Sequence, residues 1–506
     1  MGQLQKLASQ SAIYGISSIL GKTINFLLIP LYTGYLQMED LGSFTMIYAL
    51  IAFLNVLFTF GMETAYFRFA TGKGLAPDRV YHNAQTLVGL VAILLGSLLY
   101  FLSGSIAEVL NYPGKSHLFK WVALILAIDA LLAIPFAKLR MEGKALTFAL
   151  IKLSNIFLNV GLNLLFIVVA YHIYMGDWLP GMQRWVATIY NPEWGVDYII
   201  LANLLANAAL IPVLAYYGGP IRMRLDKTVI KPMWSYAYPL LFMGLAGVVN
   251  EVFSRGLFEY AIPEDYFSGL TKREAAGVFG ANFKLAIFMN LIIQAFKYAA
   301  EPFFFQQAEN KQSPLVFAKV MHWFILFCTF LMVAVSVNLD LIARLFFQSP
   351  GYESGLKIVP MLLLGYLFLG IYYNLSIWFK LTDQTSYSFY MTALGALITI
   401  GTILVLVPRW GFMGGAFSTL ASYFAMSAVC FWLGQKYFPI PYRVKEALLL
   451  LSLSIAFSYV GFWIDTGNQL LNFVIHNAFL VLYGSILFLM EKKELTSLIK
   501  NNRQKQ

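Results

Sequence analysis

The chain has 506 residues, of which 59% are hydrophobic and only 12% are charged. A soluble domain carries about a quarter of its residues as charged side chains, so this composition excludes an ordinary water-soluble protein. We interpret the formal net charge of +10 as basic connections between membrane segments, with some affinity for lipid, rather than as a nucleic-acid-binding surface.

Apolar stretches long enough to cross a membrane recur along the whole chain. A span needs about 20 residues, and its backbone groups must pair within their own helix. The sequence therefore predicts an all-α polytopic membrane protein with about fourteen spans. The predicted spans are 11–35, 41–66, 83–104, 118–137, 145–171, 197–217, 233–260, 276–299, 315–337, 358–379, 387–407, 412–434, 446–464 and 473–490. The aromatic connection near 172–196 is expected to lie along the membrane interface.

Basic residues decide the predicted orientation. With the N-terminus inside, most Lys and Arg of the connections fall on the cytoplasmic side, as the positive-inside rule requires. We therefore expect a multi-pass protein of a cytoplasmic membrane, with both termini in the cytoplasm. The expected inner clusters are Arg68, Lys73 and Arg79; Lys138, Arg140 and Lys144; Arg222, Arg224, Lys227 and Lys231; Lys436, Arg443 and Lys445; and Lys492, Lys493, Lys500, Arg503 and Lys505.

Similar tracts at the starts of two spans predict an internal repeat. Residues 41–44 (LGSF) open the second span and resemble residues 276–279 (AGVF), which open the eighth. Six helices return the chain to the same side of the membrane, so a six-helix repeat must run parallel, about an axis near the membrane normal. The alternative is that glycine and aromatic residues simply recur at helix starts. The predicted parts are a six-helix lobe over 1–220, a second over 221–440, and two additional helices with a basic cytoplasmic tail over 441–506.

Cations within the predicted spans are candidates for substrate binding, because a charge in lipid is costly unless it faces a partner or water. Lys22 lies midway along the first span with no acidic residue close in sequence, and spans seven and eight carry Arg255 and Lys284. A water-filled cavity lined by cations suits an anionic substrate such as a phosphate or pyrophosphate headgroup. The predicted substrate-binding set is Lys22, Arg255, Lys284, Lys152, Asn155 and Asn159.

A second group of polar residues is predicted to couple or gate the transport cycle. Glu251, Arg255 and Glu259 are spaced by four, which places them on one face of a helix. Asp129 is either a counter-ion for a cation or a protonatable or sodium-binding carboxylate. The predicted coupling or gating set is Asp129, Glu251, Glu259, Glu63 and Arg68.

Each of these candidates also has a purely structural interpretation. The Glu251–Arg255–Glu259 ladder is equally well explained as an ion-pair network that fixes helix packing. The asparagines of span five are typical of hydrogen bonds between membrane helices. Arg68 and Lys152 lie near the inner boundary, where long side chains extend toward water.

Catalytic and metal-binding signals are weak. The tract 15–23 (GISSILGKT) resembles a phosphate-binding P-loop, but five residues separate its glycines where four are needed, and no strand precedes it. Cys328 and Cys430 fall within spans, and the five histidines are scattered. We predict that the chain is not an enzyme and has no cofactor or metal site. The sequence does not decide whether transport is coupled to H⁺, to Na⁺ or to the membrane potential.

Five tracts in order resemble one known family: 11–32 (SAIYGISSILGKTINFLLIPLY), 61–69 (GMETAYFRF), 129–142 (DALLAIPFAKLRME), 250–265 (NEVFSRGLFEYAIPED) and 277–305 (GVFGANFKLAIFMNLIIQAFKYAAEPFFF). They are similar to the polysaccharide-biosynthesis branch of the MOP superfamily, which also holds lipid II flippases and MATE drug exporters, and most closely to O-antigen-type oligosaccharide flippases. The resemblance implies two six-helix lobes around a cationic cavity, alternating access, and residence in a bacterial inner membrane.

The same resemblance implies a substrate and partners. The substrate would be a polyprenyl-pyrophosphate-linked oligosaccharide, a surface polysaccharide precursor, moved from the inner to the outer leaflet. Membrane lipid, glycosyltransferases and a polysaccharide polymerase are the expected partners, and no nucleic acid is expected. In lipid II flippases two extra helices form a groove for the lipid tail, which would explain the pair after residue 440.

Individual positions only partly follow the family pattern. Lys22 falls where the family often has arginine, which keeps the charge and loses the bidentate fork. Arg255 falls at the arginine of an Asp-Arg pair, but Ser254 replaces the aspartate here. The rival hypotheses are a cation-coupled exporter of small molecules centred on Asp129 and a membrane enzyme of glycan assembly.

Overall fold

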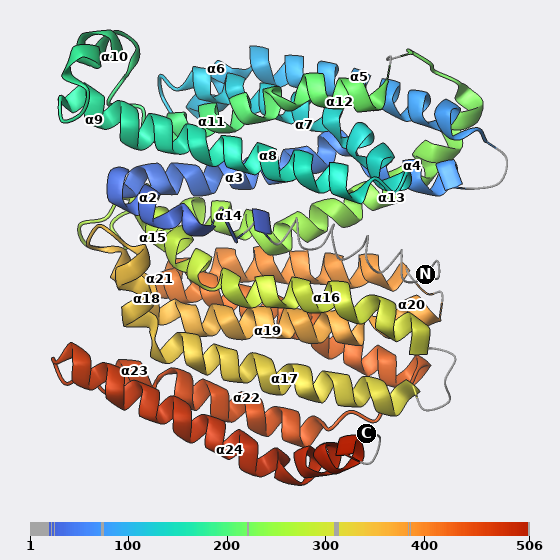
Figure 1. The fold of residues 1–506 in the computed structure, drawn as a ribbon, viewed down its shortest axis with the longest axis vertical. Helices are drawn as coiled ribbons and strands as arrows, with labels where there is room; N and C mark the ends of the chain where they lie inside the picture. The colour runs from blue at the N-terminus through green and yellow to red at the C-terminus, as the bar shows by residue number, and fades with distance from the viewer. Residues whose placement is uncertain are drawn as a thin grey trace. The chain divides into compact units, whose positions relative to one another are not determined.

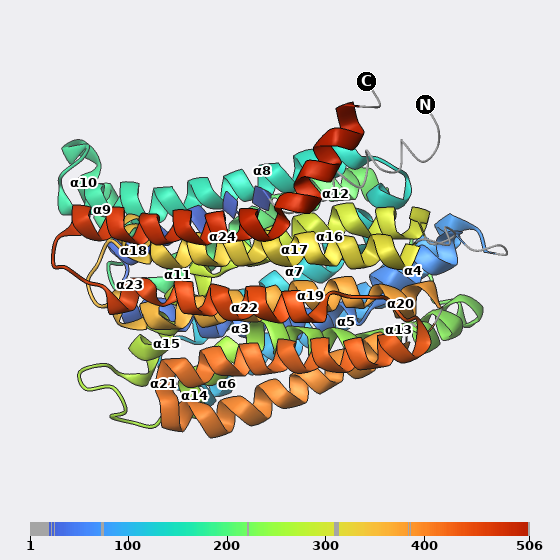
Figure 2. The same ribbon diagram turned by 90° about the horizontal axis from the view of Figure 1, so that it is seen from below.

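The computed structural model describes residues 20–21, 23–24, 26–71, 75–219, 222–307, 313–382, 384 and 386–503, in which every regular element is a helix (Figures 1 and 2). Contacts divide the chain into two compact units, a first unit of residues 1–280 with 388–408 and a second unit of residues 281–387 with 409–506. The lobes predicted from the sequence, 1–220 and 221–440, are halves of an internal repeat. A division by contacts does not test a repeat, so these boundaries stay a prediction.

The first unit holds α2 (Ile29–Tyr35), α3 (Met38–Thr59), α4 (Met62–Thr71), α5 (Pro77–Phe101), α6 (Ser103–Val109), α7 (Ser116–Met141), α8 (Ala145–Leu164), α9 (Ala170–Met175), α10 (Gln183–Ile189), α11 (Val196–Ala208), α12 (Leu210–Gly218), α13 (Lys227–Val248) and α14 (Ser254–Ala261). Two π-helical turns, η1 (Leu165–Val169) and η3 (Val249–Phe253), join α8 to α9 and α13 to α14, and the short 3-10 turn η2 (Pro180–Met182) precedes α10. The next helix, α15 (Lys272–Leu285), begins in the first unit and ends in the second.

The second unit holds α16 (Ile287–Gln307), α17 (Ser313–Val337), α18 (Leu339–Phe346), the 3-10 turn η4 (Tyr352–Ile358), α19 (Val359–Leu375), α20 (Ile377–Leu381), α22 (Val444–Ser458), α23 (Val460–Trp463) and α24 (Gln469–Arg503). A further helix, α21 (Ser386–Tyr437), breaks at Gly411, whose φ of 51° and ψ of −125° are not helical. Glycine adopts such a positive φ at little cost because it lacks a Cβ atom. This break falls between the predicted spans 387–407 and 412–434.

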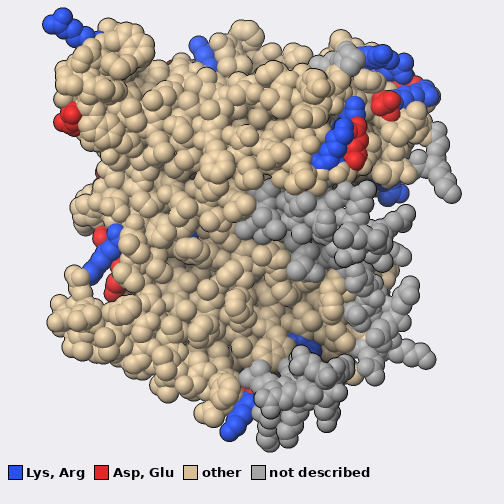
Figure 3. All heavy atoms as spheres, viewed as in Figure 1, with Lys and Arg blue, Asp and Glu red and all other residues tan. Residues whose placement is uncertain are grey.

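Ten helices of the described residues are long and apolar enough to cross a membrane, and the pair Lys272–Leu285 and Ile287–Lys297, bent by 43°, makes an eleventh when it is taken as one span. Figure 3 shows a broad face with few charged side chains, most of which lie toward its two sides, where helices end in Figure 1. Such a surface is compatible with lipid and not with water. The predicted all-α polytopic fold is therefore confirmed. The number of about fourteen spans stays a prediction, because α21 counts once although it contains two predicted spans.

Small residues hold the first unit together where α5 and α7 cross. A Cβ atom placed on Gly96 would lie 3.2 Å from the Cβ of Ala127 and 3.7 Å from the backbone oxygen of Ala123. Lipid supplies no hydrophobic force between helices, so close packing of small residues is what holds such a crossing.

The two glycines that mark the predicted repeat contact each other in the first unit. A Cβ atom on Gly277 would lie 2.2 Å from the backbone oxygen of Met38 and 3.0 Å from the backbone nitrogen of Gly42. A Cβ atom on Gly42 would lie 1.9 Å from the backbone oxygen of Arg273. The start of α3 therefore touches α15 backbone to backbone, which any larger side chain would prevent.

The connection between α12 and α13 is fixed to α5 by Asp226. Its carboxylate accepts hydrogen bonds from the Thr228 backbone and side chain and from Arg79, and its own backbone N–H donates to Asn83 Oδ1 at 2.6 Å. The Thr228 hydroxyl and the Arg79 guanidinium lower the pKa of Asp226 to about 2. Because this pKa is below that of the unfolded chain, the stability that the carboxylate contributes is present above pH ~4 and is lost as the pH falls toward 2.

We predict that Gly42→Ala destabilises the protein, because the new methyl group overlaps the α15 backbone and forces the crossing apart. The expected loss is about 1–3 kcal/mol of unfolding free energy, measured by thermal denaturation in one detergent. Gly161→Ala in α8 is the matched control, since a Cβ atom there meets no atom within 4 Å. Equal melting temperatures for Gly42→Ala and Gly161→Ala would show that α3 and α15 do not meet in this way.

Candidate functional site

A chain of hydrogen-bonded polar side chains crosses four helices of the first unit around Asp129. Asn207 Nδ2 in α11 donates to Asp129 Oδ1 in α7 at 2.8 Å, and Asn155 Nδ2 in α8 donates to Asn207 Oδ1 at 3.1 Å. Asn207 Nδ2 also donates to Asn203 Oδ1 at 3.1 Å, and Asn203 Nδ2 donates to the Tyr48 hydroxyl of α3 at 3.0 Å. We call these five residues the Asp129 network.

The network is partly buried inside membrane-spanning helices, where an unsatisfied polar group is costly. Asp129 therefore depends on the amide donor that α11 supplies. Lys152, one turn before Asn155 on α8, is close enough for its charge to act on Asp129, and its Nζ lies 4.4 Å from the centre of the Phe136 ring. A carboxylate, three amides and one hydroxyl are an oxygen-rich set that suits a proton or a small hard cation.

Sequence reasoning identified only part of this network. It named Asp129 and Asn155 on separate spans, and the structure brings them to the same amide, that of Asn207. It missed Asn203, Asn207 and Tyr48. The signal was present, because Asn203 and Asn207 are four residues apart on one helix face, the same spacing that marked span five.

The other asparagines of α8 form a second, smaller group. Asn163 Nδ2 donates to Asn159 Oδ1 at 2.9 Å, and the Tyr32 hydroxyl of α2 donates to Asn163 Oδ1 at 3.2 Å. The π-helical turn η1 begins two residues later. The predicted substrate-binding role of Asn159 stays a prediction. Its observed contact is with Asn163, and Asn163 in turn ties α8 to α2.

The predicted ladder on span seven meets a π-helical turn. Arg255 Nη2 donates to the backbone oxygen of Glu251 at 3.0 Å, and η3 covers Glu251. Glu259 is buried and pairs with Arg273 of α15, with 3.2 Å between Oε1 and Nε. Sequence reasoning did not name Arg273, because the two side chains come from different helices.

Glu63 and Arg68 of α4 contact different neighbours. Glu63 forms an ion pair with Arg140 of α7, and the Arg68 guanidinium lies 4.6 Å from the centre of the Tyr236 ring of α13. These contacts connect α4 to two other helices of the first unit. A gating role for Glu63 and Arg68 stays a prediction.

The predicted cations Lys22 and Lys284 are not among the five residues named as the Asp129 network. Lys22 lies outside the described residues, so its predicted role stays a prediction. Lys284 lies in the part of α15 that belongs to the second unit and is partly buried.

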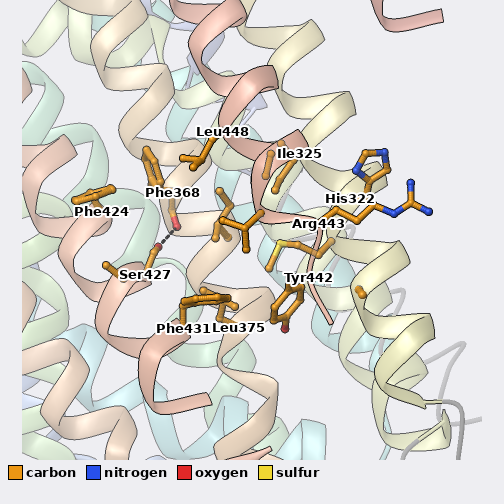
Figure 4. A pocket seen from close by; sticks show the side chains of 16 residues that line it. His322, Ile325, Phe368, Leu375, Phe424, Ser427, Phe431, Tyr442, Arg443 and Leu448 are labelled. Carbon is orange, nitrogen blue, oxygen red and sulfur yellow. Dashed lines mark hydrogen bonds between the residues drawn. The ribbon is translucent and has the colours of Figure 1, made fainter. Parts of the chain in front are cut away.

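The second unit contains an apolar pocket of about 170 Å³ between α17, α19, α21 and α22. Figure 4 shows Phe368, Phe424 and Phe431 around it and the polar side chains of His322 and Arg443 together on one side. The Ser427 hydroxyl donates to the Phe368 backbone oxygen at 2.8 Å and so presents no free polar hydrogen to the pocket. The lining suits a hydrocarbon chain.

Beside this pocket lies the one group of metal-ligating side chains that the described residues bring together: His322 of α17, Glu446 of α22 and Glu491 of α24. His322 Nε2 lies 2.7 Å from Glu491 Oε1, and His322 Nδ1 lies 3.7 Å from Glu446 Oε2. The two carboxylates thus face different ring nitrogens, whereas a metal ion would take one nitrogen and draw both carboxylates to it. The arrangement suits an imidazole held between two acids and ties the last helices to α17.

We predict that His322 and Glu491 are energetically coupled, because removal of either leaves the other buried without its hydrogen bond. In a double-mutant cycle with His322→Ala and Glu491→Ala, the expected coupling is about 0.5–3 kcal/mol of unfolding free energy. A cycle of His322→Ala with Glu446→Ala is the control and should give a smaller coupling, because Glu446 is half exposed and more distant. A coupling near zero in the first cycle would contradict the buried contact.

Comparisons with known proteins agree with this architecture. Residues 35–178 match the model of the family described as polysaccharide biosynthesis protein. No curated protein sequence matches the chain. The fold matches lipid II flippase MurJ in an inward closed conformation, with a TM-score of 0.68 and 13% identity over 96% of this chain and 100% of that chain.

Two MATE transporters are also similar in fold. An inward-facing multidrug resistance MATE transporter of the MOP superfamily has a TM-score of 0.63 at 14% identity, over 85% of this chain and 96% of that chain. A mutant of the Vibrio cholerae MATE transporter VcmN has a TM-score of 0.58 at 15% identity, over 86% of this chain and 97% of that chain. The chain is therefore a multi-pass helical membrane protein with the fold of the MOP superfamily, and the resemblance found in the sequence is confirmed.

Proposed function

We propose that the chain is a flippase that moves a polyprenyl-pyrophosphate-linked oligosaccharide across a bacterial cytoplasmic membrane by alternating access, with both termini in the cytoplasm. The observation that carries the proposal is the fold shared with lipid II flippase MurJ over 96% of this chain. The Asp129 network adds an ionisable group inside the membrane-spanning part, which either a flippase or an exporter would use for coupling. The match of residues 35–178 to a polysaccharide biosynthesis family supports the choice of substrate. Lys22, Arg255 and Lys284 stay the predicted ligands of the pyrophosphate.

In this proposal Asp129 couples transport to H⁺ or Na⁺. As a carboxylate, Asp129 accepts the Asn207 amide hydrogen. As a carboxylic acid, it would still accept that hydrogen through its carbonyl oxygen and would gain one O–H donor, which needs an acceptor on a neighbouring helix. Each charge state would thus favour a different arrangement of α7, α8 and α11. An ion that binds one arrangement more tightly than the other shifts the population between them by that difference in affinity.

The apolar pocket beside α22 would accommodate hydrocarbon of the substrate tail or of a membrane lipid. Its lining contains large aromatic side chains, and Arg443 lies on one side of it. For a membrane lipid bound in this way, the anionic headgroup would lie near Arg443 while its chain enters the pocket.

The second candidate is a cation-coupled exporter of small molecules, which the Asp129 network and the similarity to MATE transporters favour. Such an exporter would move a lipophilic cation and leave a lipid-linked glycan in place. An enzyme of glycan assembly is the weakest candidate, because the matched folds are those of a flippase and transporters.

We predict that proteoliposomes containing the protein expose a fluorescently labelled polyprenyl-pyrophosphate oligosaccharide to a membrane-impermeant quencher. Arg255→Ala should slow this exposure by about 5- to 150-fold, because the phosphate loses its bidentate donor. Arg344→Ala is the control, since Arg344 is an exposed residue of α18. Transport of tetraphenylphosphonium with no movement of the lipid-linked glycan would favour the exporter and refute the flippase.

We predict that Asp129→Asn abolishes the dependence of the transport rate on a pH or Na⁺ gradient, because the amide cannot change charge. The same proteoliposomes measure the rate with and without each gradient. Asp340→Asn, an exposed position in α18, serves as the matched control and should keep the dependence of the wild type. A gradient dependence that survives in Asp129→Asn would assign coupling to another residue.

A further inference from the structure

A second cavity lies at one end of the first unit and has a different character. It occupies about 540 Å³, within the range of about 300–1,000 Å³ that small-ligand pockets have. Its lining comes from the end of α2, the starts of α3 and α11, and the connection that contains α10, which lie at the same end of the unit in Figure 1. We call it the aromatic pocket.

Tyrosine and tryptophan side chains form much of the lining. The rings of Tyr190 and Tyr198 are parallel, with 5.1 Å between their centres, and Trp194 packs beside Tyr198 at 5.5 Å. Two further residues of the lining, Tyr35 and Tyr171, meet edge to face with 5.9 Å between their ring centres, and 42% of Tyr35 is exposed. Such rings offer flat apolar surfaces and hydroxyl groups together, at little cost in side-chain entropy.

Three charged residues of the lining, Arg273, Glu39 and Asp40, are already held by protein partners. Arg273 Nη1 lies 3.3 Å from Glu39 Oε1, and its guanidinium lies 4.0 Å from the centre of the Tyr112 ring. Asp40 accepts a hydrogen bond from the Val196 backbone N–H at 3.3 Å.

The glycine before α11 allows this approach of Asp40. A Cβ atom on Gly195 would lie 2.1 Å from Asp40 Oδ2. The carboxylate is therefore fixed in the wall of the pocket by the local backbone, with its position set before any ligand arrives.

The balance of charge excludes a pyrophosphate group as the ligand. The lining contains two cations, Lys115 and Arg273, and three acids, Glu39, Asp40 and Glu193, which leaves a net charge of −1. An anionic headgroup would meet more repulsion than attraction here. Aromatic faces with a net charge of −1 also attract organic cations, so tetraphenylphosphonium is a comparison ligand in the test below.

We propose that the aromatic pocket binds one or more uncharged sugar residues of the transported glycan, a proposal that rests on the proposed flippase function. A pyranose ring has apolar C–H faces, which stack on aromatic rings, and hydroxyl edges, which exchange hydrogen bonds with carboxylates and phenols. The pocket supplies both kinds of surface within one rigid unit. Recognition of the glycan is thus separate from recognition of the pyrophosphate.

The test is saturation-transfer-difference NMR on the full chain in lipid nanodiscs. The probes are maltotriose, chitotriose and trigalacturonate, with pyrophosphate and tetraphenylphosphonium as comparison ligands. We expect saturable binding of at least one neutral trisaccharide, weakened about ten-fold or more by Tyr35→Ala and by Tyr171→Ala. Trp185→Ala is the matched control, because Trp185 is an exposed aromatic residue of α10 outside the pocket, and it should leave the affinity within about two-fold of the wild type.

The outcomes separate this proposal from the flippase proposal. No saturable binding of either neutral trisaccharide, preferred binding of pyrophosphate, trigalacturonate or tetraphenylphosphonium, or equal weakening by Trp185→Ala would overturn the sugar site. Melting temperatures of the variants guard against unfolding, and Tyr35→Phe, which removes only the hydroxyl, should bind with intermediate affinity. The binding measurement requires no transport. A failed flippase assay would therefore not change the binding result, and a failed binding measurement would not change the transport result.

Discussion

A carboxylate within a membrane-spanning helix must have a hydrogen-bond donor, because lipid supplies none. In the first unit the Asn207 amide is that donor for Asp129, and the amide in turn accepts a hydrogen bond from Asn155 and donates to Asn203. In the function proposed above, the arrangement of α7, α8 and α11 would therefore depend on the charge state of Asp129. A purely apolar interface between the same helices would pack as well and would respond to no ion.

The remaining polar contacts have a different physical character. The Arg273–Glu259 pair, the Glu63–Arg140 pair and the His322–Glu491 contact each connect two helices through a single bond or ion pair. Such contacts fix helix packing, and their loss is expected to reduce stability. In the Asp129 network three amides are joined by hydrogen bonds, and each amide has both a donor and an acceptor group. One hydrogen bond can therefore be replaced by another while the helices stay in contact.

Hydropathy and charge were sufficient to predict the helical membrane fold, because the cost of unpaired backbone in lipid leaves few alternatives. The repeat predicted from residues 41–44 and 276–279 stays a prediction. That Gly42 and Gly277 meet at one helix crossing was not visible in the sequence. Spacing by four predicted a ladder on span seven, but the π-helical turn η3 within it and the partner Arg273 on α15 were not visible in the sequence.

Only part of the candidate site was predicted, because contacts between helices were again not visible in the sequence. Asp129 and Asn155 stand out as polar residues in apolar spans, whereas their common partner Asn207 is defined only by how three helices pack. The five scattered histidines argued against a His-rich metal site, and Glu446 and Glu491 were not considered. The packing of α17, α22 and α24 brings ligand atoms of His322, Glu446 and Glu491 within 4.8 Å of one another. Contacts between helices distant in sequence are set by tertiary packing, which periodicity within one helix does not report.

Infrared difference spectroscopy of the protein in lipid films, recorded as the pH or the Na⁺ concentration is changed, observes the charge state of Asp129 directly. A protonated carboxyl group has a C=O stretching band that the carboxylate lacks. We expect such a band to rise or fall with the coupling ion, to shift in Asn207→Ala and to be absent in Asp129→Asn. A spectrum that does not respond to either ion, or a responsive carboxyl band that persists in Asp129→Asn, would contradict the role assigned to the network.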